Sequence, residues 1–336
     1  MDALPALPLR LWWLTLLCAA AFALLWWLTL GRRRIRRRRA LRQRLAELGN
    51  GPAPIPTAAI PALPNVADPF QGRWLLMGDT AANLRGLLEA GDATLLTDAG
   101  ADALWQVWTR PGLTLVALNP SVVEDAQGTA MRSLWLRGLM ALAQHCPALP
   151  LNGVVVCVDA GTLAHSTSTA LGLLTAEAAE LLQLQLPVQV VVTGLERWPG
   201  HAEVCAGLPP AALEQVLGHR LPPENATAGS AGEQLDALFA PLSQRLQALG
   251  MSLLRTHTEP ASRLGVHRWV AQAISLEPGL HRLVAQLFRQ GGSTAWRGLY
   301  LTAAASQTAP AAFAADLFRR FLPEDQPLAR SGRTGP

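Results

Sequence analysis

The feature that most constrains this chain is an uncharged apolar segment near its N-terminus. Residues 11–30 read LWWLTLLCAAAFALLWWLTL, twenty residues without a charge. As an α-helix rising ~1.5 Å per residue, this segment would cross the ~30 Å hydrocarbon core of a bilayer. The sequence therefore predicts a membrane-spanning helix. Tryptophan pairs near both ends, where amphipathic rings meet the headgroup layers, support these bounds; they are Trp12, Trp13, Trp26 and Trp27.

A dense arginine cluster follows the predicted span and sets its orientation. Nine arginines lie between residues 32 and 44, against a single arginine before the span. This bias predicts that the first ten residues lie outside and that the rest of the chain is cytoplasmic. Basic residues after the apolar segment also favour a retained anchor over a cleaved signal peptide. The expected partners of the cluster are anionic lipid headgroups rather than nucleic acid; its first members are Arg32, Arg33, Arg34, Arg36, Arg37, Arg38 and Arg39.

The remainder of the chain divides by composition. Residues 50–70 carry a proline every few positions and predict a semi-rigid linker. From residue 71, short apolar runs alternate with helical patterns, and runs such as VVVCV are apolar throughout. This pattern predicts an α/β fold with a mostly parallel sheet that is buried on both faces. The predicted parts are a short outer N-terminus (1–10), the span (11–30), an arginine-rich juxtamembrane segment (31–49), the linker (50–70), an α/β domain (71–205), a helical extension with one returning strand (206–330) and a tail (331–336).

The individual elements follow from the same periodicity. Strands are predicted at 73–77, 94–97, 113–118, 154–159, 188–193 and 297–302. Helices are predicted at 81–89, 130–144, 170–186, 211–217, 233–253, 266–275, 279–290 and 311–321.

The first predicted strand leads into GDTAANLRGLL, the place where a P-loop-like domain carries its phosphate-binding loop. Such a loop needs glycines for close backbone approach, a lysine for the phosphate charge and a Ser/Thr for Mg²⁺. Gly78 opens the loop, but Asn83, Leu84 and Arg85 stand where glycine, lysine and Ser/Thr would be. All 28 basic residues of the chain are arginine, so no lysine can substitute from elsewhere. The loop is degenerate, and no cofactor is expected.

Two further nucleotide-binding positions also lack the required chemistry. The strand at 113–118 should end near a metal-associated aspartate, but Ala117 stands there. After residue 193, where a guanine-reading site would have a lysine and an aspartate two residues later, the chain has Gly194 and Glu196. With all three functions changed together, the sequence predicts a pseudo-GTPase domain without hydrolytic activity, and so a protein that is not an enzyme.

Other candidate sites are weaker. The seven histidines include no pair at H-x-x-H or H-x-x-x-H spacing, and His201 and Cys205 supply only two ligands, so no metal site is predicted. No G-x-S-x-G elbow surrounds a serine, so no catalytic nucleophile is predicted. Glu177 and Glu180 share a helical face, where paired carboxylates are usually solvated.

Four segments follow one another at Pro150–Ala164, Pro187–Pro222, Trp296–Gln307 and Asp316–Ala329. Together they resemble the N-terminal cytoplasmic module of the IcmF/TssM family, which comprises inner-membrane subunits of type VI secretion systems and of related type IVB machines. PLNGVVVCVDAGTLA at Pro150–Ala164 resembles the family's leucine-asparagine-glycine strand. PVQVVVTGLERWPGHAEVCAGLPPAALEQVLGHRLP at Pro187–Pro222 resembles its threonine-lysine-x-aspartate segment and the following helix. WRGLYLTAAASQ at Trp296–Gln307 resembles its arginine-glycine-aromatic strand, and DLFRRFLPEDQPLA at Asp316–Ala329 the sequence before its next span.

The resemblance, which covers about residues 70–330, implies a structural scaffold at the bacterial inner membrane, with a periplasmic N-terminus and a cytoplasmic main domain. Its implied partners are the small membrane subunit related to TssL/DotU and the baseplate components. Family members usually carry further spans and a large periplasmic region, so this sequence is expected to supply the cytoplasmic platform. The oligomeric state stays open, with a homo-oligomer as one alternative.

Two alternative functions also stay open at this point. The chain could act as a nucleotide-binding switch that uses Arg85 and loop amides in place of the missing lysine. It could also be a regulatory paralogue that competes with a full-length subunit for the same partners.

Overall fold

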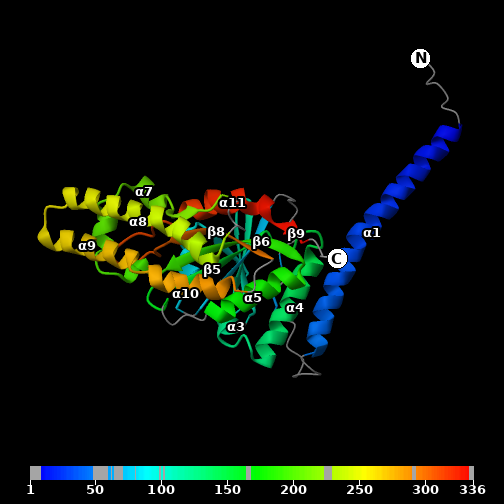
Figure 1. The fold of residues 1–336 in the computed structure, drawn as a ribbon, viewed down its shortest axis with the longest axis horizontal. Coiled ribbons are helices and arrows are strands. Elements are labelled where there is room, and N and C mark those ends of the chain that lie inside the picture. The colour runs from blue at the N-terminus through cyan, green and yellow to red at the C-terminus, as the bar shows by residue number, and fades with distance from the viewer. Residues whose placement is uncertain are drawn as a thin grey trace, which may run out of the picture.

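The computed structural model describes residues 9–47, 60–61, 63, 71–79, 81–97, 100, 103–163, 168–222, 229–289 and 293–332. Within the first of these ranges, side chains are described for residues 12–25, 39–44 and 46. The central feature is a nine-stranded sheet in the order β2-β3-β4-β1-β5-β6-β8-β7, with β9 pairing at the start of β6 (Figure 1). Its strands are β1 (Gly72–Gly78), β2 (Thr94–Thr97), β3 (Trp105–Arg110), β4 (Leu113–Leu118), β5 (Gly153–Asp159), β6 (Leu184–Thr193), β7 (Leu217–Arg220), β8 (Thr294–Leu301) and β9 (Arg330–Ser331).

The five central strands β4, β1, β5, β6 and β8 are mutually parallel. Antiparallel strands complete both sides of the sheet, β2 and β3 next to β4, and β7 next to β8. Alternate residues of one strand enter two separate apolar layers: in β5, Val154, Val156 and Val158 lie in one and Val155 and Cys157 in the other. This confirms the predicted α/β fold with a mostly parallel sheet buried on both faces.

Helices cover both faces of the sheet. The larger apolar layer lies under α3 (Pro120–Glu124), α4 (Thr129–His145), α5 (Ser168–Leu181), α8 (Ala231–Thr256), α9 (Pro260–Ile274) and α10 (Glu277–Leu287). The smaller layer lies under α2 (Leu84–Ala90), the π-helical turn η3 (Leu317–Phe321) and α11 (Leu322–Asp325). Short elements link β6 to α8 through β7, namely η2 (Leu195–Arg197), α6 (His201–Ala206) and α7 (Pro210–Glu214).

Helix α1 (Leu9–Glu47) extends away from the body, whereas α8 and α9 form a hairpin at the opposite end (Figure 1). The last turns of α1 contact α4 and α5. Leu41 is fully buried there, in the same apolar cluster as the strands, and Ala40 packs against it. The end of α1 is therefore part of the folded core, because the contact removes Leu41 from water.

The C-terminal segment closes the face opposite to α4 and α5. After η3 and α11, the short helix η4 (Gln326–Leu328) leads into β9, which pairs antiparallel with Leu184 and Gln185. Asp325 is buried beneath this segment, where its Oδ1 lies 2.9 Å from Nη2 of Arg297. Its Oδ2 accepts a hydrogen bond of 2.5 Å from Nε2 of Gln189. A charged group is thus stable inside the protein because it is paired and hydrogen-bonded.

Several element predictions were wrong. The segment 206–330 holds not one returning strand but both β7 and β8, and the helix predicted at 211–217 ends at Glu214 because β7 begins at Leu217. The helix predicted at 170–186 ends at Leu181, and Gln183 has a positive φ of 51° that turns the chain directly into β6. The helix predicted at 311–321 starts only near residue 315, and its main part is π-helical. Strand β3 was not predicted, although Trp105, Val107 and Trp108 are all buried in it.

Candidate functional site

The loop after β1 is closed by side chains of the chain itself. A Cβ atom on Gly78 would lie 3.0 Å from Ala82 Cβ and 3.1 Å from the Cys157 carbonyl oxygen, so a larger residue here would be crowded. The next residue, Asp79, is buried, and its Oδ1 accepts a hydrogen bond of 2.7 Å from the Ala82 backbone N–H. A backbone N–H that a phosphate-binding loop would offer to an anion is thus already bound to a carboxylate.

The three residues at the glycine, lysine and Ser/Thr positions have other structural roles. Asn83 is the N-cap of α2, and its Oδ1 accepts a hydrogen bond of 2.8 Å from the Gly86 N–H. Leu84 is buried in the apolar layer under α2. Arg85 points outward, 2.8 Å from the Glu89 carboxylate on the next helical turn. None of the three provides the compact cation that a polyphosphate needs inside the loop.

The segment after β6 is held in a similar way. Gly194 has a φ of +90°, and a Cβ atom there would lie 2.4 Å from Asp159 Oδ2. Glu196 Oε2 accepts a hydrogen bond of 3.1 Å from the backbone N–H of Ala304 after β8. Arg197 forms an ion pair with Asp159. The predicted base-reading positions therefore tie neighbouring strands together.

Asp159 ends β5 and links these two segments. It is buried, and its Oδ1 accepts hydrogen bonds from the N–H groups of Gly161 at 2.8 Å and Thr162 at 3.2 Å. The Thr162 hydroxyl donates to Asp79 Oδ2 at 3.4 Å. Strands β1 and β5 are adjacent, and their following helices α2 and α5 cover opposite faces. Such a switch point at the carboxyl ends of parallel strands is where α/β proteins bind ligands.

A cavity of about 560 Å³ opens beside this switch point, and we call it the carboxyl-edge pocket. Its volume is in the range of ligand pockets. Five of the residues predicted from the degenerate nucleotide positions line it, and Gly78 and Gly194 shape the two neighbouring turns. The lining includes Asn83, Leu84, Arg85, Leu88, Trp105, Gln106, Ala117, Leu118, Asn119, Glu196 and Arg197.

Burial shifts the pKa values of three groups in this part of the molecule, Cys157, His201 and Cys205, toward their uncharged forms. Burial, followed by the charge of Asp79, strongly raises the pKa of the Cys157 thiol. Burial also raises the pKa of Cys205 to about 11 and lowers the pKa of His201, whose Nε2 lies 3.4 Å from the Cys205 sulfur. Since the thiolate is the nucleophilic form, neither cysteine is activated. His201 and Cys205 thus lie one turn apart on α6 with their side chains in contact.

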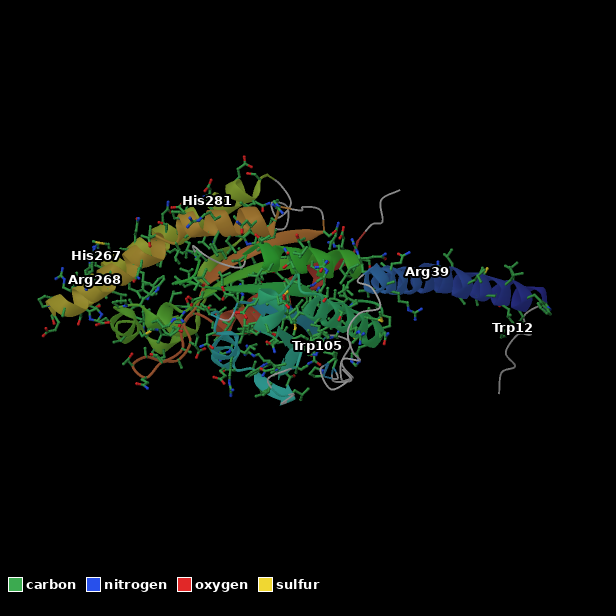
Figure 2. The ribbon with its side chains drawn as sticks, turned by 90° about the horizontal axis from the view of Figure 1, so that it is seen from below. Trp12, Arg39, Trp105, His267, Arg268 and His281 are labelled. Carbon is green, nitrogen blue, oxygen red and sulfur yellow. The ribbon has the colours of Figure 1, made fainter. Side chains whose placement is uncertain are left out.

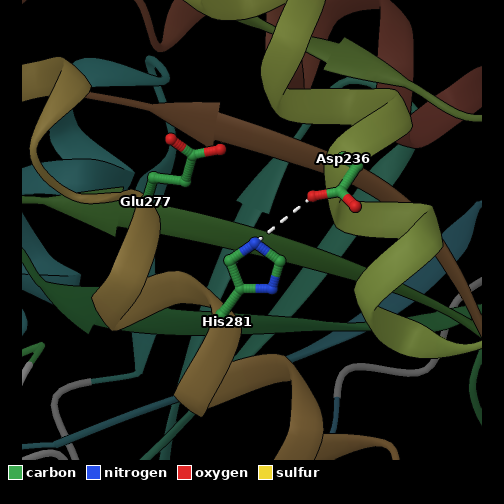
Figure 3. Close-up of side chains that lie close together, drawn as sticks. All are labelled: Asp236, Glu277 and His281. Carbon is green, nitrogen blue, oxygen red and sulfur yellow. Dashed lines mark ion pairs between the residues drawn. The ribbon is translucent and has the colours of Figure 1, made fainter.

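Within the described ranges, one group of three side chains has the spacing of metal ligands: Asp236 from α8, and Glu277 and His281 from α10 (Figure 3). Their ligand atoms lie within 4.8 Å of one another. His281 Nε2 lies 3.3 Å from Asp236 Oδ1, so an interhelical ion pair joins two of the three side chains. The side chains of Asp236 and His281 are exposed to solvent by 65% and 40%, which keeps such a pair weak.

The residues predicted to meet a membrane lie in α1. Trp12 and Trp13 are exposed, as are the other large apolar side chains described in this part of the helix, all by 59–70%. Arg39 is also exposed (Figure 2). Trp26, Trp27, Arg32, Arg33, Arg34, Arg36, Arg37 and Arg38 belong to the helix, but their side chains lie outside the described part.

Among the described residues, no helix combines the length and the apolar character that a membrane crossing requires. The span predicted at 11–30 is helical but gains no support from this finding.

Sequence reasoning missed several residues of the site. Trp105 and Asn119 line the pocket from the neighbouring strands β3 and β4, and Arg197 from η2. The only available signal was positional, because Asp79 and Asp159 directly follow or end buried apolar runs, and such strand ends meet at one edge of a parallel sheet.

The comparison with protein families identifies the chain. The model of the IcmF-related N-terminal domain matches residues 129–335, more than half of the sequence. This protein belongs to the IcmF-related family, as its sequence resemblance indicated. No curated protein and no solved structure matches it.

Proposed function

We propose that this protein is a structural subunit of a type VI secretion apparatus, attached to the inner membrane, that binds other apparatus subunits at the cytoplasmic face and hydrolyses no nucleotide. Membership of the IcmF-related family supports the proposed role in a secretion apparatus. The observation that carries the absence of hydrolysis is the closed loop after β1, where Asp79 accepts the Ala82 N–H. An enzyme of this fold would instead need that N–H, a lysine and a magnesium ligand for the phosphates.

The order of the strands supports a P-loop-like ancestry for the domain. Strand β1 is central, its following loop lies at the carboxyl edge, and the chain leaves β1 and β5 toward opposite faces. This is the arrangement that places a phosphate loop next to a ligand crevice. A pseudo-GTPase keeps such a frame while its loop has lost the chemistry, which fits the buried Leu84 and the outward Arg85.

Helix α1 supports attachment to a bilayer. Eight large apolar side chains between residues 12 and 25 are exposed by 59–70%, a surface that water does not favour. The arginine cluster that follows would meet anionic headgroups on the cytoplasmic side. Flotation of the full chain with vesicles, with and without anionic lipid, tests this attachment; a chain that stays in the dense fractions with both vesicle types contradicts it.

The test of the scaffold function is a tagged pull-down from native cells in mild detergent, with crosslinking and mass spectrometry. We expect recovery of a TssL/DotU-like membrane subunit or of baseplate components, with crosslinks to the α/β domain. A matched preparation that lacks the tag measures nonspecific recovery. Enrichment of no apparatus subunit above that control would contradict the proposal.

A second candidate is a nucleotide-binding switch, which the carboxyl-edge pocket favours because it lies beside the loop and includes Arg85. Titration with fluorescent GTP and ATP analogues in the presence of Mg²⁺ separates the two functions. Saturable binding at micromolar protein that is lost in Arg85→Gln would favour the switch. Absence of binding removes it and leaves the scaffold.

A further inference from the structure

Three side chains from α8 and α10 meet at one place on the surface (Figure 3). Glu277 and His281 are four residues apart on α10, so they lie one turn apart on the same side of the helix. Asp236 faces them from α8, which packs against α10. One ligand atom of each side chain lies within 4.8 Å of the other two. The packing of the two helices therefore brings together three potential metal ligands, two carboxylate oxygens and one imidazole nitrogen.

The spacing of the ion pair in this group is that of neighbouring metal ligands. His281 Nε2 lies 3.3 Å from Asp236 Oδ1. Charge-assisted hydrogen bonds between nitrogen and oxygen are shorter, usually ~2.7–2.9 Å. Two ligands of a tetrahedral zinc ion, each with a bond of about 2.0–2.2 Å, lie roughly 3.3–3.5 Å apart. An ion placed between the two side chains would therefore find them at the correct separation.

Glu277 is the member of the group that the ion pair leaves out. In the part of the chain that the structure describes, no hydrogen bond or ion pair holds its carboxylate. Its place in the first turn of α10 stabilises the negative charge, because a helix N-terminus carries partial positive charge. One of its oxygens lies within 4.8 Å of an oxygen of Asp236, so the two carboxylates repel each other. A divalent cation between them would remove this repulsion.

The donor set indicates the kind of metal. One imidazole with two carboxylates is a set that suits Zn²⁺, whereas Ca²⁺ and Mg²⁺ prefer sites made of oxygen ligands alone. Three protein ligands leave a fourth tetrahedral position open. The side chains of Asp236 and His281 are exposed by 65% and 40%, so an ion can reach them from solution.

We propose that Asp236, Glu277 and His281 form a surface binding site for a divalent transition metal, with Zn²⁺ as the ion that matches the donor set. None of the three residues lines the carboxyl-edge pocket, so this site is separate from the degenerate nucleotide positions. The bound ion would connect α8 to α10, which α9 separates in the sequence. Because the three ligands come together only in the folded chain, metal binding would stabilise the packing of these helices. The site goes beyond the scaffold function and does not depend on it.

Titration of the full chain with Zn²⁺ tests the site. The chain is purified in mild detergent with a tag that contains no histidine, freed of metal with a chelator and titrated in a calorimeter. Loss of an outer hydrogen-bond partner of a metal ligand already weakens affinity by about 10- to 100-fold. We therefore expect at least tenfold weaker binding for Asp236→Asn, Glu277→Gln and His281→Ala. His267→Ala removes an exposed histidine of α9 and is the matched control, whose affinity should not change.

Two further measurements locate the bound ion. Zn²⁺ should raise the midpoint of thermal unfolding of the native chain and of His267→Ala, but not that of His281→Ala. Co²⁺, used as a spectroscopic substitute, should give a visible absorption without a thiolate charge-transfer band, because no cysteine belongs to the group.

Three results would overturn the site. They are equal Zn²⁺ affinity in the native chain and all three ligand variants, absence of saturable binding at micromolar protein, and a thiolate band that persists in His281→Ala. Each of them would leave the scaffold function intact, because the pull-down tests that function separately.

Discussion

Two of the ion pairs that join an arginine to a buried aspartate differ in what surrounds the arginine. In the pair of Arg297 with Asp325, the side chains are exposed by only 4% and 1%. In the pair of Arg197 with Asp159, the aspartate is exposed by 3% but the arginine by 53%. The first pair lies beneath the C-terminal segment, whereas the second borders the carboxyl-edge pocket. The closed pair is enclosed by the fold, whereas the open pair leaves the guanidinium group of Arg197 exposed at the pocket.

The largest effect is expected at the closed pair. Arg297→Ala leaves Asp325 buried with Gln189 and Arg220 as its remaining partners, the latter at 3.5 Å. Removal of one member of a buried pair costs about 3–5 kcal/mol. Urea unfolding should show that loss in the free energy of unfolding, while Arg320→Gln, at an exposed pair, should leave the midpoint unchanged. If removal of Arg197 from the open pair lowered the free energy of unfolding by the same amount, the two pairs would not differ in their contribution to stability.

A smaller effect is expected at the open pair. Arg197→Ala removes one charged partner, but Asp159 keeps the N–H groups of Gly161 and Thr162. The loss of one charged hydrogen bond predicts about 1.5–3 kcal/mol in the same urea experiment. The double variant Arg197→Ala with Asp159→Asn should be more stable than Arg197→Ala alone, because it removes the uncompensated charge. A double variant that is less stable would contradict this account.

The glycine that supports the open pair should matter less. Gly194→Ala forces a side chain into the left-handed region, where Gly194 has φ +90°, at a cost of about 1–2 kcal/mol. The new Cβ would also meet the Arg197 guanidinium and the Asp159 carboxylate. In the Arg197→Ala background part of this contact is gone. The double variant should therefore lose less free energy of unfolding than the two single variants lose together. Strict additivity would show that Gly194 acts through its backbone alone.

The smallest effect is a pH dependence near the open pair, on α6. Burial lowers the pKa of His201 below its ordinary value of 6.5. The unfolded chain then binds this proton more readily, so the stabilisation is complete above pH 6.5 and is lost as the pH falls through the lowered native pKa. Unfolding measured between pH 8 and 5 should show a flatter profile for His201→Gln than for the native chain. The exposed His267→Gln is the control and should keep the native profile.

The sequence predicted the elements whose apolar pattern is continuous. Strands β4 and β5 are buried throughout, and no alternative pattern competes with Leu113–Leu118 or VVVCV. The prediction of the boundary between α5 and β6 was wrong because leucines continue across it. The turn is made by Gln183, not by glycine or proline. Strand β3 was missed because Gln106 and Thr109 interrupt its apolar residues, and both tryptophans become buried only through pairing with β4.

Some members of the candidate site were predictable, but its contacts were not. The changes at Asn83, Leu84 and Arg85 could be read directly against the requirements of a phosphate loop. That Asp79 would bind the Ala82 N–H, and that Glu196 would bind the Ala304 N–H, depends on loop conformation and on a strand more than a hundred residues later. The pairing of Asp236 with His281 likewise requires two helices to pack first.

The burial of Leu41 gives α1 a mechanical role. A continuous helix of 39 residues is about 58 Å long at ~1.5 Å per residue, and its last turns are clamped against α4 and α5. Beside this clamp, Arg132 of α4 pairs with Glu177 of α5. A tilt or rotation imposed on the far end of α1 would therefore act on these two helices, and through α5 on strands β6 and β8, which it contacts. Leu41 is thus the point at which a movement of α1 would be transmitted to the folded core.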